Sequence, residues 1–435
     1  MTSSSSSKGL ADLPHVTIPD DYPFRVGAYL AECYEQHGPI FAADWPGYKV
    51  VYLVGPEANR FMLLTGREAF SHDLGWTPMI GTLMGKGLLN MDGREHDVQR
   101  KMMNPAFATS YMDRYLPVMN RVIGGRIADW AERGTVDLYD EARKITFDVA
   151  AEALVGFSAG PQVDRFRELF VTLLQGDPNA RTDEDFFASS LNARDTLMPL
   201  LKEQIEARRA NPTGDILGIL VQARDDEGRA LSDAQLLGHL NILLVAGHET
   251  STSLSAWLLY LLSTHPDYLA RVRREVDTLL GNEAPHLEAV KAMKVLGNAL
   301  SEAERLYPPV ANGPRGATKA FTFDGYTIPA GQRVLYSIAA SHLLPHVWRE
   351  PARFDPDRFA PPREEDKKHP YALVGFGGGP RVCIGLNFAT VEIKAMAATI
   401  LKRYELTPEP GQEVVQVYQG TGGPLHGIRM SVREL

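Results

Sequence analysis

Cysteine is scarce in this chain of 435 residues, which has only Cys33 and Cys383. A disulfide framework needs several cysteines and a zinc cage needs three or four neighbouring ligands, so a disulfide scaffold and a cysteine-only metal site are excluded. Basic residues are not in excess either, because 45 Lys and Arg stand against 54 Asp and Glu, giving a net charge of −9. This balance argues against nucleic-acid binding through bulk positive charge.

Long apolar runs are missing as well. Residues 1–15 contain no apolar segment of the kind that signal peptides and anchors have, and the most apolar stretch, 235–262, is interrupted by a polar run from Gly247 to Ser253. Neither approaches the ~20 apolar residues that cross a bilayer. We therefore expect no membrane anchor, a cytoplasmic location and a disordered lead-in over residues 1–15.

What the sequence has in quantity is helical periodicity. Apolar residues recur at helical spacing through most of the chain between residues 95 and 307, including one stretch of about 32 residues at 232–263. Strand-like runs are short and lie apart from the helices, at 39–43, 49–54, 320–328 and 405–435. Since no Gly- or Pro-rich linker separates two cores, the pattern predicts a mainly α fold with small segregated β-sheets and a single domain over residues 16–435.

The sharpest local feature is the segment Phe376-Gly-Gly-Gly-Pro-Arg-Val-Cys383-Ile-Gly385, which precedes a predicted helix at 384–404. Consecutive glycines let the backbone turn tightly and approach a bulky ligand. A cysteine at a helix N-terminus is favoured as thiolate, and one thiolate suffices as the axial ligand of haem iron. A buried structural cysteine, or a catalytic thiol served by a distant histidine, are the alternatives.

Two charged patterns lie within predicted helices. Glu302 and Arg305 share one helix face, and Arg358 could join them in a buried network, although a solvated surface pair has the same spacing. Glu249 and Thr250 interrupt the apolar centre of the longest helix, where a carboxylate is costly unless it has a purpose. A hydroxyl there can bond to the carbonyl at i−4 and leave room for a small molecule; a wet helix face is the alternative.

Taken in order, these elements resemble the cytochrome P-450 family of haem-thiolate monooxygenases, in particular its soluble bacterial members. The resemblance rests on the acid–alcohol pair, then the ExxR, PxRF and FxxGxRxCxG patterns, over residues 249–385. It implies haem b (iron protoporphyrin IX) as cofactor, with Cys383 as the ligand of the metal. Phe376 would cover the thiolate, and Gly379 and Gly385 would permit the loop.

The resemblance assigns the remaining candidates to three roles. Contacts with the haem propionates would come from Arg381, Arg315, Arg100 and His96. A widened oxygen groove at Ala246 and Gly247 would adjoin the proton-delivery pair, Glu249 and Thr250. A structural triad would be formed by Glu302, Arg305 and Arg358.

The implied activity is insertion of one oxygen atom of O2 into an apolar substrate, such as a fatty acid, a terpenoid or a steroid-like molecule. Electrons would come from NAD(P)H through a separate ferredoxin and ferredoxin reductase, and we expect a monomer. The family layout places six candidate residues around the substrate: Trp76, Met79, Leu83, Leu88, Phe170 and Val310. Basic residues that could steer the partner are Arg94, Lys101, Lys367, Lys368 and Lys394.

Two other functions stay open for this chain. A peroxide-driven hydroxylase would use the same cysteine loop without a redox partner. A non-catalytic haem-binding or sensor protein would use it without oxygen chemistry, although such a protein has no need of the acid–alcohol pair at Glu249 and Thr250. Product formation with peroxide alone, compared with NAD(P)H and redox proteins, separates the three functions.

Overall fold

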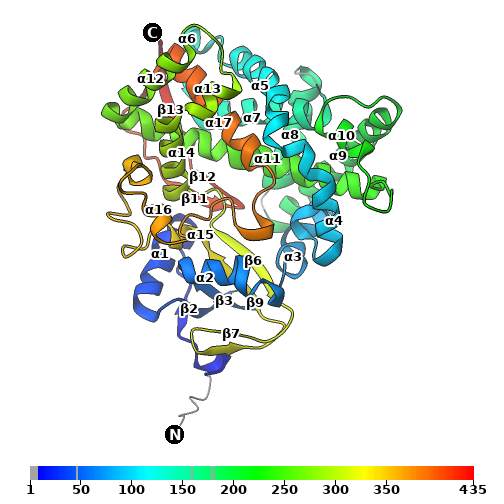
Figure 1. The fold of residues 1–435 in the computed structure, drawn as a ribbon, viewed down its shortest axis with the longest axis vertical. Helices are drawn as coiled ribbons and strands as arrows, with labels where there is room; N and C mark the ends of the chain where they lie inside the picture. Colours follow the sequence, from blue (N-terminus) through cyan, green and yellow to red (C-terminus); the bar gives the residue numbers. More distant parts are fainter. Residues whose placement is uncertain (1–7, 46–47, 158–159, 178–179, 181) are drawn as a thin grey trace.

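The computed structural model describes residues 8–45, 48–157, 160–177, 180 and 182–435. The strands of the main sheet gather in the lower part of the view in Figure 1, near the N-terminus, and most of the helices lie in the larger upper part. The main sheet has the strand order β1-β2-β3-β9-β6-β4. Its strands are β1 (His15–Thr17), β2 (Ile40–Trp45), β3 (Tyr48–Val54), β9 (Arg333–Ser337), β6 (Asn312–Ala317) and β4 (Phe70–Ser71).

Three small sheets are not paired with the main sheet through strand hydrogen bonds. One has the order β10-β13-β5, and the other two are the antiparallel pairs β11-β12 and β7-β8. Their strands are β5 (Thr135–Asp137), β7 (Phe321–Phe323), β8 (Tyr326–Ile328), β10 (Tyr404–Pro408), β11 (Gln416–Gln419), β12 (Thr421–Pro424) and β13 (Arg429–Glu434).

Several of the helices pack against the long helix α11. Those of the first half are α1 (Tyr22–His37), α2 (Pro56–Arg60), α3 (Asp73–Met84), α4 (Gly93–Met103), α5 (Met112–Arg126), α6 (Trp130–Arg133), α7 (Leu138–Val155), α8 (Pro161–Gln175) and α9 (Asp183–Ala210). Those of the second half are α10 (Ile216–Gln222), α11 (Asp233–Thr264), α12 (Pro266–Leu280), α13 (Leu287–Ala292), α14 (Lys294–Leu306), α15 (Ile338–Ser341), α16 (Glu365–Lys368) and α17 (Leu386–Arg403).

Helix α11 is long because both of its ends are defined by local chemistry. The Ser232 hydroxyl accepts the Gln235 backbone N–H, and the Gln235 side chain accepts the Ser232 N–H in return, which is a capping box. At the other end Pro266 begins α12 and cannot continue the helix. Between these ends most side chains are buried against α7 and α17, so α11 runs through the largest hydrophobic cluster.

The predicted mainly α fold with small segregated sheets is confirmed, with local differences. The helical stretch predicted at 95–130 is interrupted between α4 and α5 by two short 3-10 segments, the first of which contains Pro105, and between α5 and α6 by a turn at 127–129. Helix α3 and strands β6 and β9 are not apparent from the sequence. Strand β6 reads Asn-Gly-Pro-Arg-Gly-Ala and has low strand propensity, so its pairing with β9 and β4 creates it.

The N-terminal segment also differs from its prediction. Lys8 pairs with Tyr326, and a 3-10 turn at Leu10–Asp12 leads into β1, so residues 8–15 have regular contacts. The rest of the predicted lead-in, residues 1–7, lies outside the described residues. Among the helices in the described ranges, none has both the length and the apolarity that a bilayer-spanning helix needs.

Candidate functional site

The cysteine loop is held in shape by its own backbone. The Cys383 N–H donates to the Phe376 carbonyl at 2.8 Å, and Gly385 caps α17, so Cys383 lies just before the helix as predicted. Gly379 has φ +60°, and a Cβ on it would lie 2.4 Å from the Leu63 carbonyl oxygen, so that position requires glycine. Gly385 has φ −84°, an ordinary backbone conformation.

The Cys383 thiol is accessible and yet surrounded by protein. The Cys383 side chain is accessible to solvent, yet burial of the thiol raises its pKa above the usual value. A side chain with both properties lies on the wall of an interior space and not on the outer surface. The backbone N–H groups of Gly385 and Leu386 and the Arg100 guanidinium lower this pKa, but less than burial raises it.

Buried and half-buried cations gather beside this loop. Arg315 on β6 is 4% exposed, and its guanidinium donates to the carbonyl of Pro314 at 2.7 Å. Arg381 donates to the Met91 carbonyl at 2.8 Å, and Arg100 on α4 donates to the Val382 carbonyl at 2.7 Å. Burial lowers the pKa of all three guanidinium groups, that of Arg381 to about 10. This group of cations therefore favours an anionic partner.

Two histidines belong to the same group. His96, on α4 with Arg100, is 1% exposed and lies 2.9 Å from the Asp97 carboxylate through Nδ1, and burial lowers its pKa. His72, before α3, was not singled out from the sequence; burial and then Arg315, Arg381 and His96 lower its pKa well below the usual value. A lone histidine carries no motif, so only the packing identifies it.

Two atoms of this group are buried without a hydrogen-bond partner among the described residues: His72 Nδ1 and Arg381 Nη1. Buried polar atoms in folded proteins nearly always have a partner, so orphaned donors among these cations indicate a missing anion. Asp92 is the nearby acid, but it already accepts the Ser71 hydroxyl and the His72 backbone N–H, and lies 3.5 Å from Arg381.

The four candidates on α11 face different surroundings. Ala246 is exposed and Gly247 half-buried in the middle of an otherwise buried helix, and a Cβ on Gly247 would meet no atom within 4 Å. The Thr250 hydroxyl donates to the Ala246 carbonyl at 2.7 Å, as the sequence predicts for i−4 bonding. These residues therefore border open space, while Glu249 turns towards α7.

Glu249 is an ionised carboxylate with two partners that the sequence did not indicate. His248 Nε2 lies 3.1 Å and Arg143 Nε 3.2 Å from its Oε1. Burial raises the pKa of Glu249, but the two partners lower it by more, and the resulting pKa is about 2. With Arg143 and Tyr139, Glu249 also lines a hollow of about 310 Å³ between α7 and the β11-β12 hairpin, so a carboxylate 4% exposed still adjoins a cavity.

The structure brings Glu302, Arg305 and Arg358 together, each 0% exposed. Arg305 donates to both Glu302 oxygens at 2.7 and 2.9 Å, and Arg358 Nε donates to Oε1 at 3.0 Å. A fourth member was not predicted: Glu365 on α16 accepts from Arg358 Nη1 at 2.7 Å. The two cations and two carboxylates balance, which is the condition for burying charge.

The comparisons with known proteins agree with this arrangement. The family model described as Cytochrome P-450 matches residues 23–427. The chain is a cytochrome P-450. A Synechocystis protein assigned to cytochrome P-450 group 120 is 34% identical over 92% of this chain and 91% of its own length. The sterol 14α-demethylase of Mycolicibacterium vanbaalenii is 30% identical over 82% of this chain and 81% of its own.

A solved structure gives the same result for the fold. Cyanobacterial CYP120A1 with bound retinoic acid superposes with a TM-score of 0.88 at 32% identity, covering 99% of this chain and 100% of its own. The cytochrome P-450 family uses haem b and contains monooxygenases, so the predicted cofactor and enzyme class are confirmed. The residues present fit that cofactor, because an accessible thiol stands beside orphaned buried donors and cations suited to two propionates.

The predicted substrate-lining residues of this cytochrome P-450 are not equivalent. Trp76, Leu83, Leu88 and Val310 are half-buried, and Met79 is exposed. Phe170 is a correction: it is 0% exposed, with ring centroids 5.8 Å from Phe147 and 5.1 Å from Phe166. This ring fills the core next to α7, because α8 turns its apolar face inward, and it does not line accessible space.

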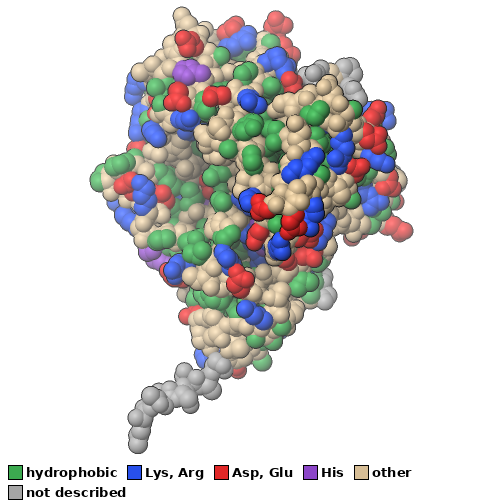
Figure 2. All heavy atoms as spheres, turned by 45° about the vertical axis from the view of Figure 1, so that its right-hand side comes forward, with side chains coloured by type: hydrophobic (Ala, Val, Ile, Leu, Met, Phe, Trp, Pro, Cys, Tyr) green, Lys and Arg blue, Asp and Glu red, His purple; other side chains and the backbone are tan. Residues whose placement is uncertain are grey.

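Several residues of the basic surface predicted for the redox partner are buried or paired with acids. Lys394 is a correction, since it is 8% exposed and donates to the carbonyls of Val290 and Met293. Arg94 pairs with Glu227 at 2.9 Å, and Lys101 with Asp226 at 2.7 Å. The face in Figure 2 accordingly shows charges of both signs interspersed.

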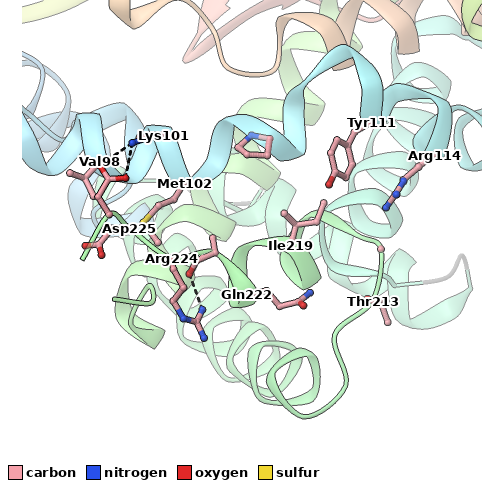
Figure 3. A pocket seen from close by; sticks show the side chains of 14 residues that line it. Val98, Lys101, Met102, Tyr111, Arg114, Thr213, Ile219, Gln222, Arg224 and Asp225 are labelled. Atoms are coloured by element: carbon pink, nitrogen blue, oxygen red, sulfur yellow. Dashed lines mark hydrogen bonds and ion pairs between the residues drawn. The ribbon is translucent and has the colours of Figure 1, made fainter. Parts of the chain in front are cut away.

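A surface pocket of about 500 Å³ lies between α4, α5 and α10 (Figure 3). Its charged lining is already engaged: Lys101 pairs with Asp226, and Arg224 donates to the Val221 and Ala223 carbonyls. None of the candidate haem or proton-delivery residues lines it. The pocket is therefore separate from the candidate site.

Proposed function

We propose that this cytochrome P-450 hydroxylates an extended apolar substrate with O2, with Cys383 as the ligand of the haem iron. The observation that carries the proposal is the accessible Cys383 thiol beside buried cations with orphaned donors. Arg100 joins the two parts, because it donates to Val382 and lowers the pKa of Cys383. When bound, thiolate-ligated haem supplies the activation of dioxygen.

The roles of Glu249 and Thr250 follow from their hydrogen bonds. The Thr250 hydrogen is directed to the Ala246 carbonyl, so the hydroxyl oxygen has lone pairs left to accept a proton-donating water. Glu249 is ionised and borders the hollow behind α11, where its carboxylate can accept hydrogen bonds from water. We assign proton delivery to this pair, with His248 and Arg143 holding the carboxylate.

Substrate and electron source are proposed by analogy. One relative of known structure has retinoic acid bound, and another relative is a sterol 14α-demethylase. Retinoic acid and sterols are both extended and largely apolar, which suits the half-buried Trp76, Leu83, Leu88 and Val310. We propose a terpenoid, fatty acid or steroid-like substrate and electrons from NAD(P)H through a ferredoxin and its reductase.

The test is a spectral titration followed by turnover. Retinoic acid, a long-chain fatty acid and a sterol are added in turn to the ferric holoprotein, and displacement of water is read as a Soret shift. The compound that shifts the spectrum should be oxidised with NADPH, ferredoxin and ferredoxin reductase. Product with peroxide but not with the redox chain would establish the peroxide-driven alternative, and binding without product by either route would establish the sensor.

A further inference from the structure

A second buried carboxyl, Glu304, lies between the two members of the ExxR pattern and takes no part in the triad. It is 7% exposed on α14, and its carboxyl accepts hydrogen bonds from the backbone N–H groups of Gly375 and Phe376. These two residues begin the cysteine loop. Glu304 therefore contacts the loop, while Glu302, on the same helix, contacts Arg305 and Arg358.

Gly375 is shaped around this carboxyl. A Cβ on Gly375 would lie 2.4 Å from Glu304 Oε1 and 2.6 Å from its Cγ, and the three nearest atoms all belong to Glu304. The φ of Gly375 is outside the left-handed region, so its backbone conformation is open to any residue. Gly379 differs, because it needs glycine for its φ of +60° and for the Leu63 carbonyl. A larger residue at 375 would therefore have to displace the Glu304 side chain.

The contact leads directly to the cysteine. Phe376 presents its N–H to Glu304 and its carbonyl to the Cys383 N–H at 2.8 Å. A displacement of Phe376 at the first bond would move the acceptor of the second. These two successive hydrogen bonds make the side chain at 304 a determinant of the geometry around the sulfur.

We propose that Glu304 is a positioning residue for the Cys383 thiolate, with Gly375 as the residue that admits its carboxyl to the loop. The inference rests on Cys383 being the iron ligand, as proposed above. Glu304 touches neither substrate nor iron in this role. It acts through the Phe376 peptide on the position of the sulfur.

The test is a double-mutant cycle between Gly375→Ala and Glu304→Ala in the full-length holoprotein. The readouts are haem content and the fraction of the reduced-CO band that is of the thiolate type. Gly375→Ala alone should lower that fraction several-fold, because the new methyl group meets the carboxyl. In the Glu304→Ala background the same change should lower it less than twofold. Equal losses in both backgrounds, or no loss in either, would overturn the proposal.

Three variants complete the design. Glu304→Gln keeps the shape and one acceptor oxygen, so the thiolate band should persist; its loss would contradict positioning by hydrogen bonding. Glu392→Ala removes another buried carboxyl, on α17, and should not rescue Gly375→Ala; rescue by it would also contradict the proposal. Cys383→Ala should lose the thiolate band, and its retention would defeat the proposed iron ligand independently of Glu304.

Discussion

Two buried glutamates on neighbouring helices have opposite protonation. Glu249 on α11 is 4% exposed and has a pKa of about 2, whereas Glu304 on α14 is 7% exposed and has a pKa of about 8. Burial raises both values, and it is the largest single influence on each. The difference is that Glu249 has Arg143 and His248 as partners, while Glu304 has two backbone N–H groups. Near-equal burial therefore does not determine charge; the partners do.

Glu392 follows the pattern of Glu304. It is buried on α17, and its oxygens have no hydrogen-bond partner among the described residues. Burial raises its pKa to about 8, an effect larger than the lowering by the Ser251 side chain. Both neutral glutamates lie on or beside elements that support the cysteine loop. The ionised one lies on the central helix, where the proposed proton path needs a charged group.

The largest expected effect is on haem ligation by the cysteine loop. Cys383→Ala removes the one thiol beside the buried cations, so the reduced-CO band of thiolate-ligated haem should disappear. The buried Cys33 is the matched control, and Cys33→Ala should leave the band at full strength. A full thiolate band in Cys383→Ala would place the ligand elsewhere.

The next effect concerns the partner of the ionised glutamate. Arg143→Leu leaves the Glu249 carboxylate buried with His248 alone, so the free energy of unfolding should fall by roughly 3 kcal/mol. Urea unfolding followed by circular dichroism measures the loss. In a Glu249→Gln background the same change should cost much less, and an equal cost there would show that Arg143 acts through packing.

The neutral glutamate predicts a dependence on pH. The pKa of Glu304 rises from 4.5 to about 8 on folding, so the native state holds more protons than the unfolded state between these values. Its contribution to stability is complete below about pH 4.5 and is lost as the pH rises towards 8. Between pH 5.5 and 7.5 the wild type should lose on the order of 2 kcal/mol relative to Glu304→Gln, measured by urea unfolding. A constant difference would contradict the raised pKa.

The smallest effect on stability is expected at Thr250, whose hydroxyl bonds only within its own helix. Thr250→Ala should change the free energy of unfolding by less than about 1 kcal/mol while raising peroxide formed per NADPH several-fold. Thr252→Ala is the matched control, because that hydroxyl bonds Thr146 across to α7 at 2.7 Å. It should cost stability without raising peroxide. Unchanged coupling in Thr250→Ala would remove Thr250 from proton delivery.

Much of the candidate site was predictable because its chemistry is local in sequence. The cysteine loop, the ExxR pattern and the interruption of the central helix are short runs whose spacing carries meaning. The partners of those runs were not predictable. His72, Arg143 and Glu304 each lie far in the chain from the residue they serve, and each alone resembles an ordinary surface residue. Glu365 lies only seven residues from Arg358, but it too resembles an ordinary surface residue.

The sequence by itself determined the helical class, the long α11, the cysteine loop before α17 and the family. These depend on periodicity and consecutive residues, which act over one or two helical turns. Only the tertiary structure decided that β6 is a strand, that Phe170 and Lys394 are buried, and that Glu249 is charged while Glu304 is neutral. Burial and long-range charge set those outcomes, and both depend on which distant elements meet.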